Sequence, residues 1–444
     1  MPKLVNQDNA QQLNANQAIG TTAKTTFFQY LLSMGPGLVV AFAWLGTGDL
    51  VDASVAGANY GYNLMWVLCI ALFCRFFFVS ALAKYQLCNI HGDQTIFHGF
   101  FRVWKGFPLL LGVSSYVMGF VYVSYMIRGA GTAMYHLFGQ VGNTFIWSCV
   151  GVIVAIFMMT RKQQYRALEY IAQTACVVIL GSFLFTIFKT GMDIKGFFLG
   201  LTFGLPEDKD AFGALLIAIS IIGAVGGSAA NLLYPELMIN KGWKGPSYRK
   251  LQTFDLLTGI LAIIAINLCV WIVAAETMYG QGQNLHNETD LATMMELAIG
   301  SIGPTLLWIT IFFVCFTSYP TFSFGFTKLL IDGVHLTFAR GKKYEKPESD
   351  PFFRWFQIGG LLVLPLIFAM PFAPNLITLT IVGNSLAVIT APIIIVGIIF
   401  MTSRKSFMLP QYVNKWWENS ILGIIGCVGL YATYSLITVL LDRL

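Results

Sequence analysis

Charged residues are scarce in this chain. Asp, Glu, Lys and Arg make up 11% of its 444 residues, whereas an average soluble domain is about 25% charged. Hydrophobic residues account for 56%, so most of the surface must face lipid rather than water. We therefore predict a polytopic membrane protein whose main partner is the bilayer, which excludes disordered, fibrous and free nucleic-acid-binding classes.

Several chemical motifs are also absent. None of the eight cysteines belongs to a Cys-x-x-Cys pair, so neither a disulfide framework nor a zinc knuckle is expected. The sequence has no His-Glu-x-x-His, no Gly-x-Ser-x-Gly and no Walker-type loop. These absences argue against an enzyme and against a nucleotide as partner or cofactor. The polar N-terminal segment lacks the pattern of a cleaved signal peptide.

Long apolar segments are abundant instead. A membrane-spanning helix needs roughly 20 mostly apolar residues, and about eleven segments reach that length. We expect an all-α protein with spans near 31–57, 62–83, 108–138, 143–160, 167–188, 211–239, 253–276, 301–333, 352–371, 376–402 and 417–441.

Basic residues are distributed unevenly between the connecting segments. If the N-terminus is inside, about 20 Lys and Arg fall on inner segments and about 4 on outer ones. This asymmetry predicts a cytoplasmic N-terminal tail (1–30) and an extracytoplasmic C-terminus. It also explains the net charge of +6 without a nucleic-acid partner.

Two of the predicted spans are interrupted by small residues. The first contains Gly46-Thr47-Gly48-Asp49, and the sixth contains Gly226-Gly227-Ser228-Ala229-Ala230-Asn231. Clustered glycine destabilises a helix, and unwound backbone at membrane depth must be buried in protein or line a cavity. Paired interruptions five spans apart indicate an inverted-repeat transporter with its site at the midplane. We expect a core over 31–402, with halves 31–188 and 211–402, and then a cytoplasmic loop and an eleventh helix over 403–444.

Among the ionisable residues in or beside these spans, the candidates for function are Asp49, Asp52, Arg128 and Glu236. Such groups persist in membranes when they pair, face a cavity or function. Asp49 and Asp52 share one helix face, and carboxylates beside freed backbone carbonyls suit a hard divalent cation. The alternative is structural: Asp52 only pairs with Arg128, and Glu236 only caps or pairs near the cytoplasmic end.

The residues around the first break are recognisable. Gly35-Pro36-Gly37, the Gly46–Asp49 segment and Ala56-Gly57-Ala58-Asn59-Tyr60-Gly61-Tyr62 are similar to the first helix and loop of the Nramp family of divalent metal transporters. The resemblance covers about residues 30–405. It implies the leucine-transporter architecture, with two inverted five-helix repeats and broken helices one and six.

The motifs of that family are altered at their functional positions. Its first-helix Asp-Pro-Gly-Asn reads Gly46, Thr47, Gly48, Asp49, and its sixth-helix Met-Pro-His-Asn reads Ser228, Ala229, Ala230, Asn231. The acids of its proton path are replaced by Tyr125 and Arg128. Its helix-ten Gln falls at or next to Asn384 and Ser385, with Thr390 one or two turns on.

This pattern resembles the magnesium transporters of a divergent branch of the family. The resemblance implies transport of a hard divalent cation, of the Mg²⁺ or Mn²⁺ class, in a bacterial plasma membrane and without the proton coupling of typical members. Asp49 would be the charged ligand, beside Thr47, the carbonyls near Gly46 and Ser228, and Asn231. Asn384 would contact the ion through water, and Asp52, Tyr125, Arg128, Glu236, Ser385 and Thr390 would line the cavity or serve coupling.

A second interpretation remains open. The backbone N–H groups at the helix-six break suit an anion, and Arg128 lies on a helix that lines the cavity in this architecture. The site would then hold a small carboxylate-bearing organic solute. The missing first-helix Asp at position 46 favours this alternative.

Overall fold

The computed structural model describes residues 47–93, 95–159, 181, 184–207, 212–338, 343–344 and 346–441. Over these ranges the regular elements are all helical, without a β-strand. Eight helices there are long and apolar enough to cross a membrane. The predicted tail (1–30), the first part of the first span and most of the predicted span 167–188 lie outside the described residues.

The first half of the chain follows the predicted spans within a few residues. Its helices are α4 (Thr47–Tyr60), α5 (Met65–Cys88), α6 (Ile96–Val103), α7 (Phe107–Leu137), α8 (Thr144–Met159) and α10 (Ile194–Leu199). Both α6 and α10 lie in segments predicted as loops. They are too short to meet the length used to find spans.

The second half contains the interrupted helix. There α11 (Ala214–Ile221) continues through a π-helical turn (Ile222–Gly226), and a 3-10 turn (Ala229–Leu232) leads into α12 (Leu233–Asn240). The remaining helices are α13 (Arg249–Thr277), α14 (Glu288–Ile299), α15 (Gly303–Thr337), α16 (Pro351–Arg354) with its π-helical and 3-10 continuation (Trp355–Val363, Leu364–Ala369), α17 (Leu376–Ala387), α18 (Thr390–Thr402) and α19 (Trp416–Leu441).

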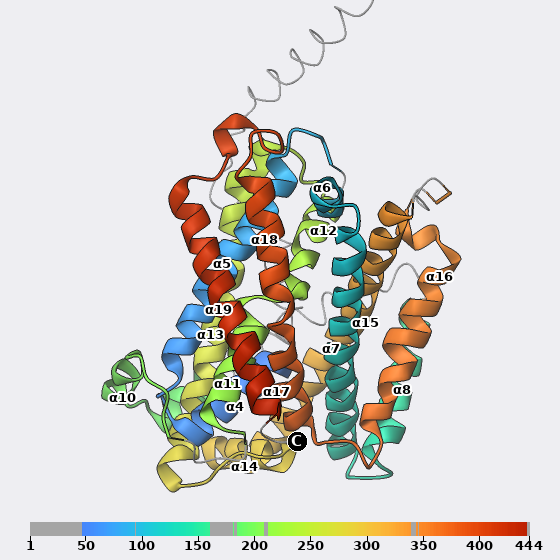
Figure 1. Ribbon diagram of the computed structural model, residues 1–444. Coiled ribbons are helices and arrows are strands. Elements are labelled where there is room, and N and C mark those ends of the chain that lie inside the picture. The colour runs from blue at the N-terminus through green and yellow to red at the C-terminus, as the bar shows by residue number, and fades with distance from the viewer. Residues whose placement is uncertain are drawn as a thin grey trace, which may run out of the picture.

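The long helices stand side by side in one bundle (Figure 1). The pair α7 and α15 packs along much of its length, and α13 packs on α4. Close approach depends on glycine: a Cβ on Gly57 would lie 2.6 Å from the carbonyl oxygen of Trp271, and one on Gly333 would lie 2.4 Å from that of Pro108. Small residues at helix contacts are typical of membrane bundles, where packing rather than hydrophobic burial drives association.

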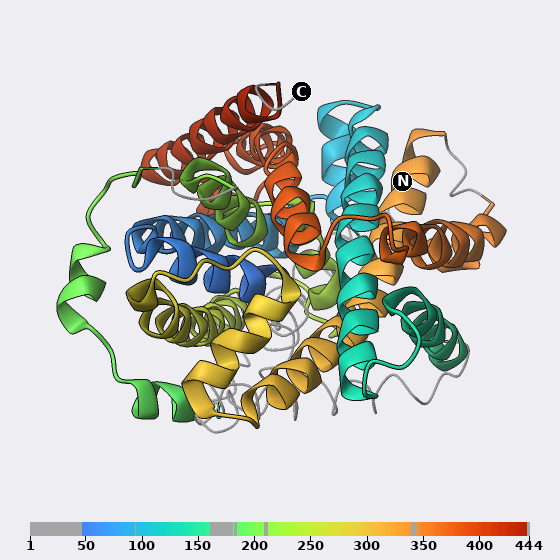
Figure 2. The ribbon, with the colours of Figure 1, turned by 90° about the horizontal axis from the view of Figure 1, so that it is seen from below.

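The two ends of the bundle carry different short helices. In Figure 1, α6 lies at the upper end, called here the α6 end, and α14 lies at the lower end, called the α14 end. Viewed from below, α14 lies across its end of the bundle (Figure 2). The loop predicted over 277–300 thus contains a helix, begun by a capping box in which Asn287 and Asp290 each accept from the other's backbone. Such boxes satisfy the free N–H groups of a first helical turn.

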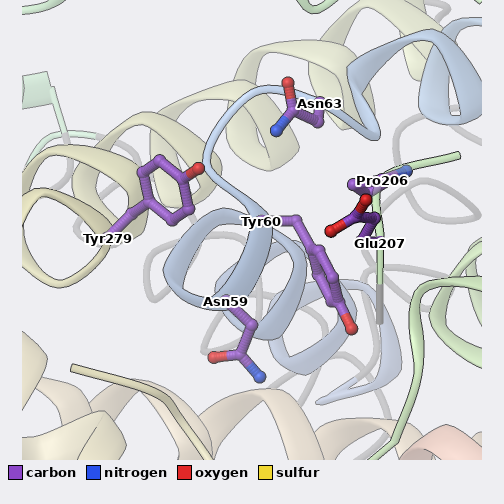
Figure 3. A pocket seen from close by; sticks show the side chains of 6 residues that line it. All are labelled: Asn59, Tyr60, Asn63, Pro206, Glu207 and Tyr279. Atoms are coloured by element: carbon purple, nitrogen blue, oxygen red, sulfur yellow. The ribbon is translucent and has the colours of Figure 1, made fainter. Parts of the chain in front are cut away.

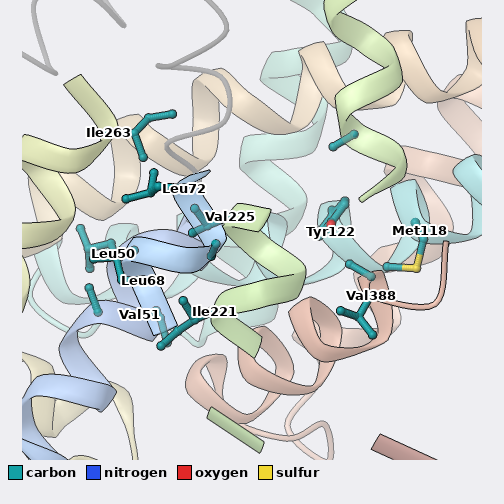
Figure 4. Packing of buried hydrophobic residues seen from close by; sticks show 14 of the residues in the cluster. Leu50, Val51, Leu68, Leu72, Met118, Tyr122, Ile221, Val225, Ile263 and Val388 are labelled. Carbon is teal, nitrogen blue, oxygen red and sulfur yellow. The ribbon is translucent and has the colours of Figure 1, made fainter. Parts of the chain in front are cut away.

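Part of the buried core lies between α4, α5 and the interrupted helix. Leu50, Leu68 and Val225, one from each, are buried and lie together in Figure 4. Large apolar side chains elsewhere are exposed, among them Phe157 and Val396. In a spanning protein these exposed side chains face lipid, as the scarcity of charge predicts.

Candidate functional site

The sixth predicted span is broken where the glycines predicted. Gly227 and Ser228 are extended rather than helical, so the ladder of helical hydrogen bonds stops there. The hydroxyl of Thr390 on α18 accepts the N–H of Ala229 at 3.0 Å, and the carbonyl of Ser228 accepts the N–H of Asn231 at 3.0 Å. The free N–H group that opens the second half-helix therefore has a partner inside the protein.

Asp49 lies in the first turn of α4, level with this break. Its side chain is buried, at 3% exposure, and its Oδ2 accepts no hydrogen bond from the described residues. An unpaired buried acceptor is costly. A polar atom without a donor among the described residues is a candidate ligand for a bound cation. Gly46, the other first-helix candidate, lies outside the described residues, as does the side chain of Thr47.

Asp52 has the opposite environment, because both of its oxygens are occupied. Ser220 donates to Oδ1 at 2.7 Å, and Asn384 donates to Oδ2 at 2.9 Å. The hydroxyl of Tyr125 in turn donates to Asn384 Oδ1 at 3.1 Å. We call Asp52, Ser220, Asn384 and Tyr125 the Asp52 network. It joins α4, α11, α17 and α7 beside the break.

Arg128 does not pair with Asp52, so the structural alternative for that residue is wrong. Its guanidinium lies at the α14 end, 3.8 Å from Glu288, and donates to the carbonyl of Phe368 at 3.0 Å. The predicted pairing is wrong because neutral donors, Ser220 and Asn384, occupy both carboxylate oxygens of Asp52.

Glu236 lies at the α6 end, where the pairing that the structural alternative predicted is found. Lys328 on α15 lies 2.8 Å from its carboxylate. Glu348 lies 3.5 Å from the same ammonium group. Glu236 of the first turn of α12 therefore belongs to an ion-pair cluster and not to the break.

The remaining candidates lie in or near the break. Ser228 and Asn231 are buried at 2% exposure. Ser385 donates to the carbonyl of Ile381 at 2.7 Å, which is an ordinary contact within a helix. Thr390 serves the break through Ala229. The structure thus brings Asp49, the Asp52 network, Ser228, Asn231 and Thr390 to one level and leaves Arg128 and Glu236 at the two ends.

One charged residue at this level was missed by the sequence reasoning. Arg75 of α5 is buried, at 2% exposure. The signal was present in the sequence, because an arginine in the middle of an apolar span is a functional candidate by default.

A small cavity lies elsewhere, at the α14 end. It has a volume of about 190 Å³ and is lined by Asn59, Tyr60, Asn63, Pro206, Glu207 and Tyr279 (Figure 3). Asn59 follows Asp49 by ten residues of α4, which corresponds to about 15 Å along a helix. The cavity is therefore separate from the break.

The donor set at the break is poor in metal ligands of the usual kind. Among the described residues, no three His, Cys, Asp or Glu side chains gather as a metal cluster would. An ion at this level would rely on one carboxylate, neutral side-chain oxygens and backbone carbonyls. Such donors suit hard cations that keep part of their water.

Comparison with known proteins agrees with this architecture. The model of the Nramp family, described as natural resistance-associated macrophage protein-like, matches residues 37–439. The chain belongs to the Nramp family. Members of this family are integral membrane transporters rather than enzymes, which agrees with the missing catalytic motifs.

The similarity of this Nramp protein to individual relatives is low but extended. It is 22% identical over 297 residues to the divalent metal cation transporter MntH of Caldanaerobacter subterraneus, covering 66% of this chain and 68% of the relative. A crystal structure of a variant of the Eremococcus coleocola manganese transporter has a TM-score of 0.72 at 16% identity, covering 94% of this chain and 89% of the other. MhsT in complex with L-phenylalanine has a TM-score of 0.57 at 13% identity, covering 91% and 98%. These likenesses confirm the predicted leucine-transporter fold.

Proposed function

We propose that this Nramp protein transports a hard divalent cation of the Mg²⁺ or Mn²⁺ class by alternating access. The proposal places it in a bacterial plasma membrane with its N-terminus in the cytoplasm. The two halves of the core, 31–188 and 211–402, would form the inverted repeats, and the ion would bind between the breaks in their first helices. Membership of the family supports transport of a divalent metal, as the name of the Caldanaerobacter relative states for that protein.

The buried Oδ2 of Asp49 carries the assignment of the site. It is a charged acceptor at the level of the helix-six break, without a hydrogen-bond donor among the described residues. A cation would satisfy it and neutralise its charge. Asn231, the carbonyl near Ser228 and, through water, Asn384 would contribute the neutral oxygens.

The class of ion follows from the missing soft donors. The position that resembles the family's Met ligand is Ser228, so no sulfur faces the break from it. Transition-metal selectivity needs such ligands, whereas Mg²⁺ takes carboxylate and carbonyl oxygens with retained water. A site with one carboxylate favours a cation that enters partly hydrated.

The same comparison argues against proton coupling of the usual kind. Tyr125 and Arg128 stand where the resemblance places the acids of a proton path. Tyrosine and arginine release protons only well above neutral pH. Tyr125 is moreover a hydrogen-bond donor within the Asp52 network, and Arg128 is held at the α14 end. We therefore propose transport down the electrochemical gradient of the ion.

Alternating access requires contacts that open and close at each end. At the α14 end, Asn59 exchanges two hydrogen bonds with the backbone of Leu285, of 2.7 and 3.2 Å. At the α6 end, Lys328 joins Glu236 of the second half-helix to α15. We propose that these two sets of contacts break in turn.

The organic-solute alternative has less support. Its two anchors were the N–H groups of the break and Arg128. Thr390 accepts from Ala229, and Arg128 faces Glu288 rather than the break. Neither anchor is therefore available to bind the carboxylate of a solute at the level of Asp49.

Uptake into proteoliposomes tests the proposal. Mg²⁺, Mn²⁺ and Ca²⁺ would each be supplied outside while internal metal and pH are followed with two dyes. We expect Mg²⁺ or Mn²⁺ entry without internal acidification. No flux of any of the three ions would refute metal transport, and metal-dependent acidification would refute the uncoupled mechanism.

Calorimetry with paired variants tests the site. Asp49→Asn should weaken metal binding at least tenfold, about 1.4 kcal/mol, because it removes the only charge assigned to the ion. Asp255→Asn is the matched control. Asp255 is also buried, but its carboxylate accepts a hydrogen bond from the Tyr234 hydroxyl at 3.1 Å and lies toward one end of the bundle rather than at the break. Equal affinities for the wild type and Asp49→Asn would remove Asp49 from the site.

A further inference from the structure

Two hydrogen bonds at the α6 end join α6 to α15 through a single hydroxyl group. The hydroxyl of Thr95, the N-cap of α6, donates to Oδ2 of Asp332 on α15 at 2.8 Å. The same hydroxyl oxygen lies 3.0 Å from Nδ1 of His98. Because the hydroxyl has one hydrogen and gives it to Asp332, the His98 ring is the donor in the second bond. We call Asp332, Thr95 and His98 the Asp332 chain.

The Asp332 chain can reverse its direction without losing a hydrogen bond. If Asp332 takes up a proton, its carboxyl group donates to Thr95, and the Thr95 hydroxyl then donates to Nδ1 of His98. The ring hydrogen moves from Nδ1 to Nε2 by exchange with water, so one proton is gained in total and it resides on Asp332. A neutral imidazole can donate or accept at Nδ1. Burial lowers the pKa of His98 below its ordinary value, which keeps the ring neutral near neutral pH.

Asp332 differs from the other acids near it because it has no cation of its own. It is buried, at 8% exposure, and among the described residues no Lys, Arg or His forms an ion pair with it. Glu236 and Glu348, by contrast, lie 2.8 and 3.5 Å from the ammonium group of Lys328. Protonation of Asp332 therefore breaks no ion pair.

The Asp332 chain lies beside the contact that closes the α6 end in the proposed cycle. Lys328 and Asp332 are four residues apart, so they are neighbours on one face of α15. A charged Asp332 competes with Glu236 for the ammonium group of Lys328, because both carboxylates attract it. A neutral Asp332 does not compete, so its protonation strengthens the pair of Lys328 and Glu236.

Two further pairs of titratable or charged groups lie near the chain. Arg102 of α6 forms an ion pair with Asp93 at 2.8 Å, and the Tyr85 hydroxyl of α5 donates to the same carboxylate at 2.8 Å. His335 on α15 lies 3.0 Å from Asp350. In both pairs the acid already has a basic partner, so a change in protonation there would first have to disturb an existing pair.

We propose that Asp332 is a regulatory proton-binding site, at which uptake of one proton from the cytoplasm holds the α6 end closed and slows transport. This inference rests on the proposed function, in which the pair of Glu236 and Lys328 opens in each cycle. The proton stays on Asp332 and does not cross the membrane with the ion, so the inference agrees with transport without proton coupling. Acidification of the cytoplasm would thus limit further entry of the cation.

Uptake of Mg²⁺ into proteoliposomes tests this inference, with the same pH on both sides set between about 5 and 8. We expect the maximal rate of the wild type to fall about fivefold toward the acid end of this range, a size typical of allosteric coupling. Asp332→Asn should be slow at every pH, because its amide donates to Thr95 as the protonated carboxyl group does. Thr95→Val removes the donor of the charged form, so the fall in rate should move to higher pH, and Thr95→Ser should restore the wild-type profile.

Two histidine variants separate this site from its neighbours. His98→Gln keeps a side chain that can donate or accept a hydrogen bond but cannot become charged, and His335→Gln is the matched control on the same face of α15. Both variants should retain the fall in rate at low pH. Loss of the response in either variant would place the proton on that histidine and overturn the inference.

Infrared difference spectroscopy of the purified full-length protein gives a readout that does not depend on transport. Between the two ends of the pH range, the wild type should gain the band of a protonated, buried carboxyl group. Asp332→Asn should lack this band, and Glu348→Gln, which removes a more exposed acid of the same cluster, should keep it.

The outcomes distinguish this inference from the proposed function. If the wild type transports metal at the same rate at every pH, or if the infrared band persists in Asp332→Asn, the inference fails and the proposed function stands. If Asp332→Asn does not fold, Thr95→Val decides, because an unchanged pH profile in that variant refutes the inference. If the wild type transports no metal at any pH, both fail together.

Discussion

Replacement of Gly223 by alanine should disrupt the site from a position that contacts no ion. Gly223 lies in the π-helical turn before the break, where an added Cβ would stand 1.9 Å from the carbonyl oxygen of Asn384. This separation is about 1.5 Å short of the 3.4 Å at which such contacts become ordinary. The obstacle is backbone, which cannot rotate away as a side chain does, so α17 must shift.

The magnitude follows from the two effects of that shift. Overpacking costs about 1–3 kcal/mol, and each hydrogen bond that Asn384 loses, to Asp52 or from Tyr125, costs about 1 kcal/mol. We expect a loss of about 4 kcal/mol. An unfolding entropy of about 2.1 cal/mol/K per residue over 444 residues converts this loss to a fall of about 4 °C in melting temperature.

Thermal unfolding of purified protein measures this effect, with Gly423→Ala as the control. A Cβ on Gly423 of α19 would meet nothing within 4 Å, and alanine stabilises a helix interior by about 1 kcal/mol over glycine. Gly423→Ala should therefore melt at or slightly above the wild-type temperature. Equal melting temperatures for Gly223→Ala and the wild type, with metal uptake intact, would show that α17 does not depend on this contact.

Two further predictions concern the α6 end. Glu236→Gln removes the charge that faces Lys328 at 2.8 Å and should lower the free energy of unfolding by about 2 kcal/mol, measured by thermal unfolding. The carboxylate of Glu348 is more exposed and more distant from Lys328, so Glu348→Gln should cost only about 0.5 kcal/mol. Equal losses for the two variants would contradict the prediction that the Glu236 pair is the stronger one. Burial lowers the pKa of His98 on α6 below its ordinary value of 6.5, against the attraction of Asp93, so the unfolded chain binds a proton that the folded one resists. The stability that His98 contributes should be complete above pH 6.5 and decline as the pH falls below it, and a His98→Gln variant that keeps the full acid-side decline of the wild type would disprove this source.

The spans were predictable because bilayer thickness fixes the length of an apolar segment. The helix ends at Cys88, Leu137 and Thr402 lie within a few residues of the predicted ones. The short helices α6, α10 and α14 were not predicted, because they are shorter than the roughly 20 residues used to find spans. In α14 the signal was local and readable: Asn287 and Asp290 stand at the spacing of a capping box.

The site was predictable in its residue types but not in its pairings. The clustered glycines predicted the position of the break, and the presence of a charged residue within an apolar span indicated Asp49. Pairing depends on which helices are neighbours, which one sequence does not reveal. Asp52 therefore binds Ser220 and Asn384 rather than Arg128.

The Asp52 network has a consequence for how this sequence can change over evolutionary time. Its donors come from Ser220, Asn384 and Tyr125, on three helices far apart in the chain. Loss of any one leaves a buried polar atom unsatisfied, so a single substitution is selected against even where a pair would be tolerated. Divergence at these positions should therefore be concerted. Among homologues, an apolar residue at position 52 should occur together with the loss of the hydroxyl at 220 or the amide at 384. Independent variation of the three positions would show that the Asp52 network does not make these residues change together.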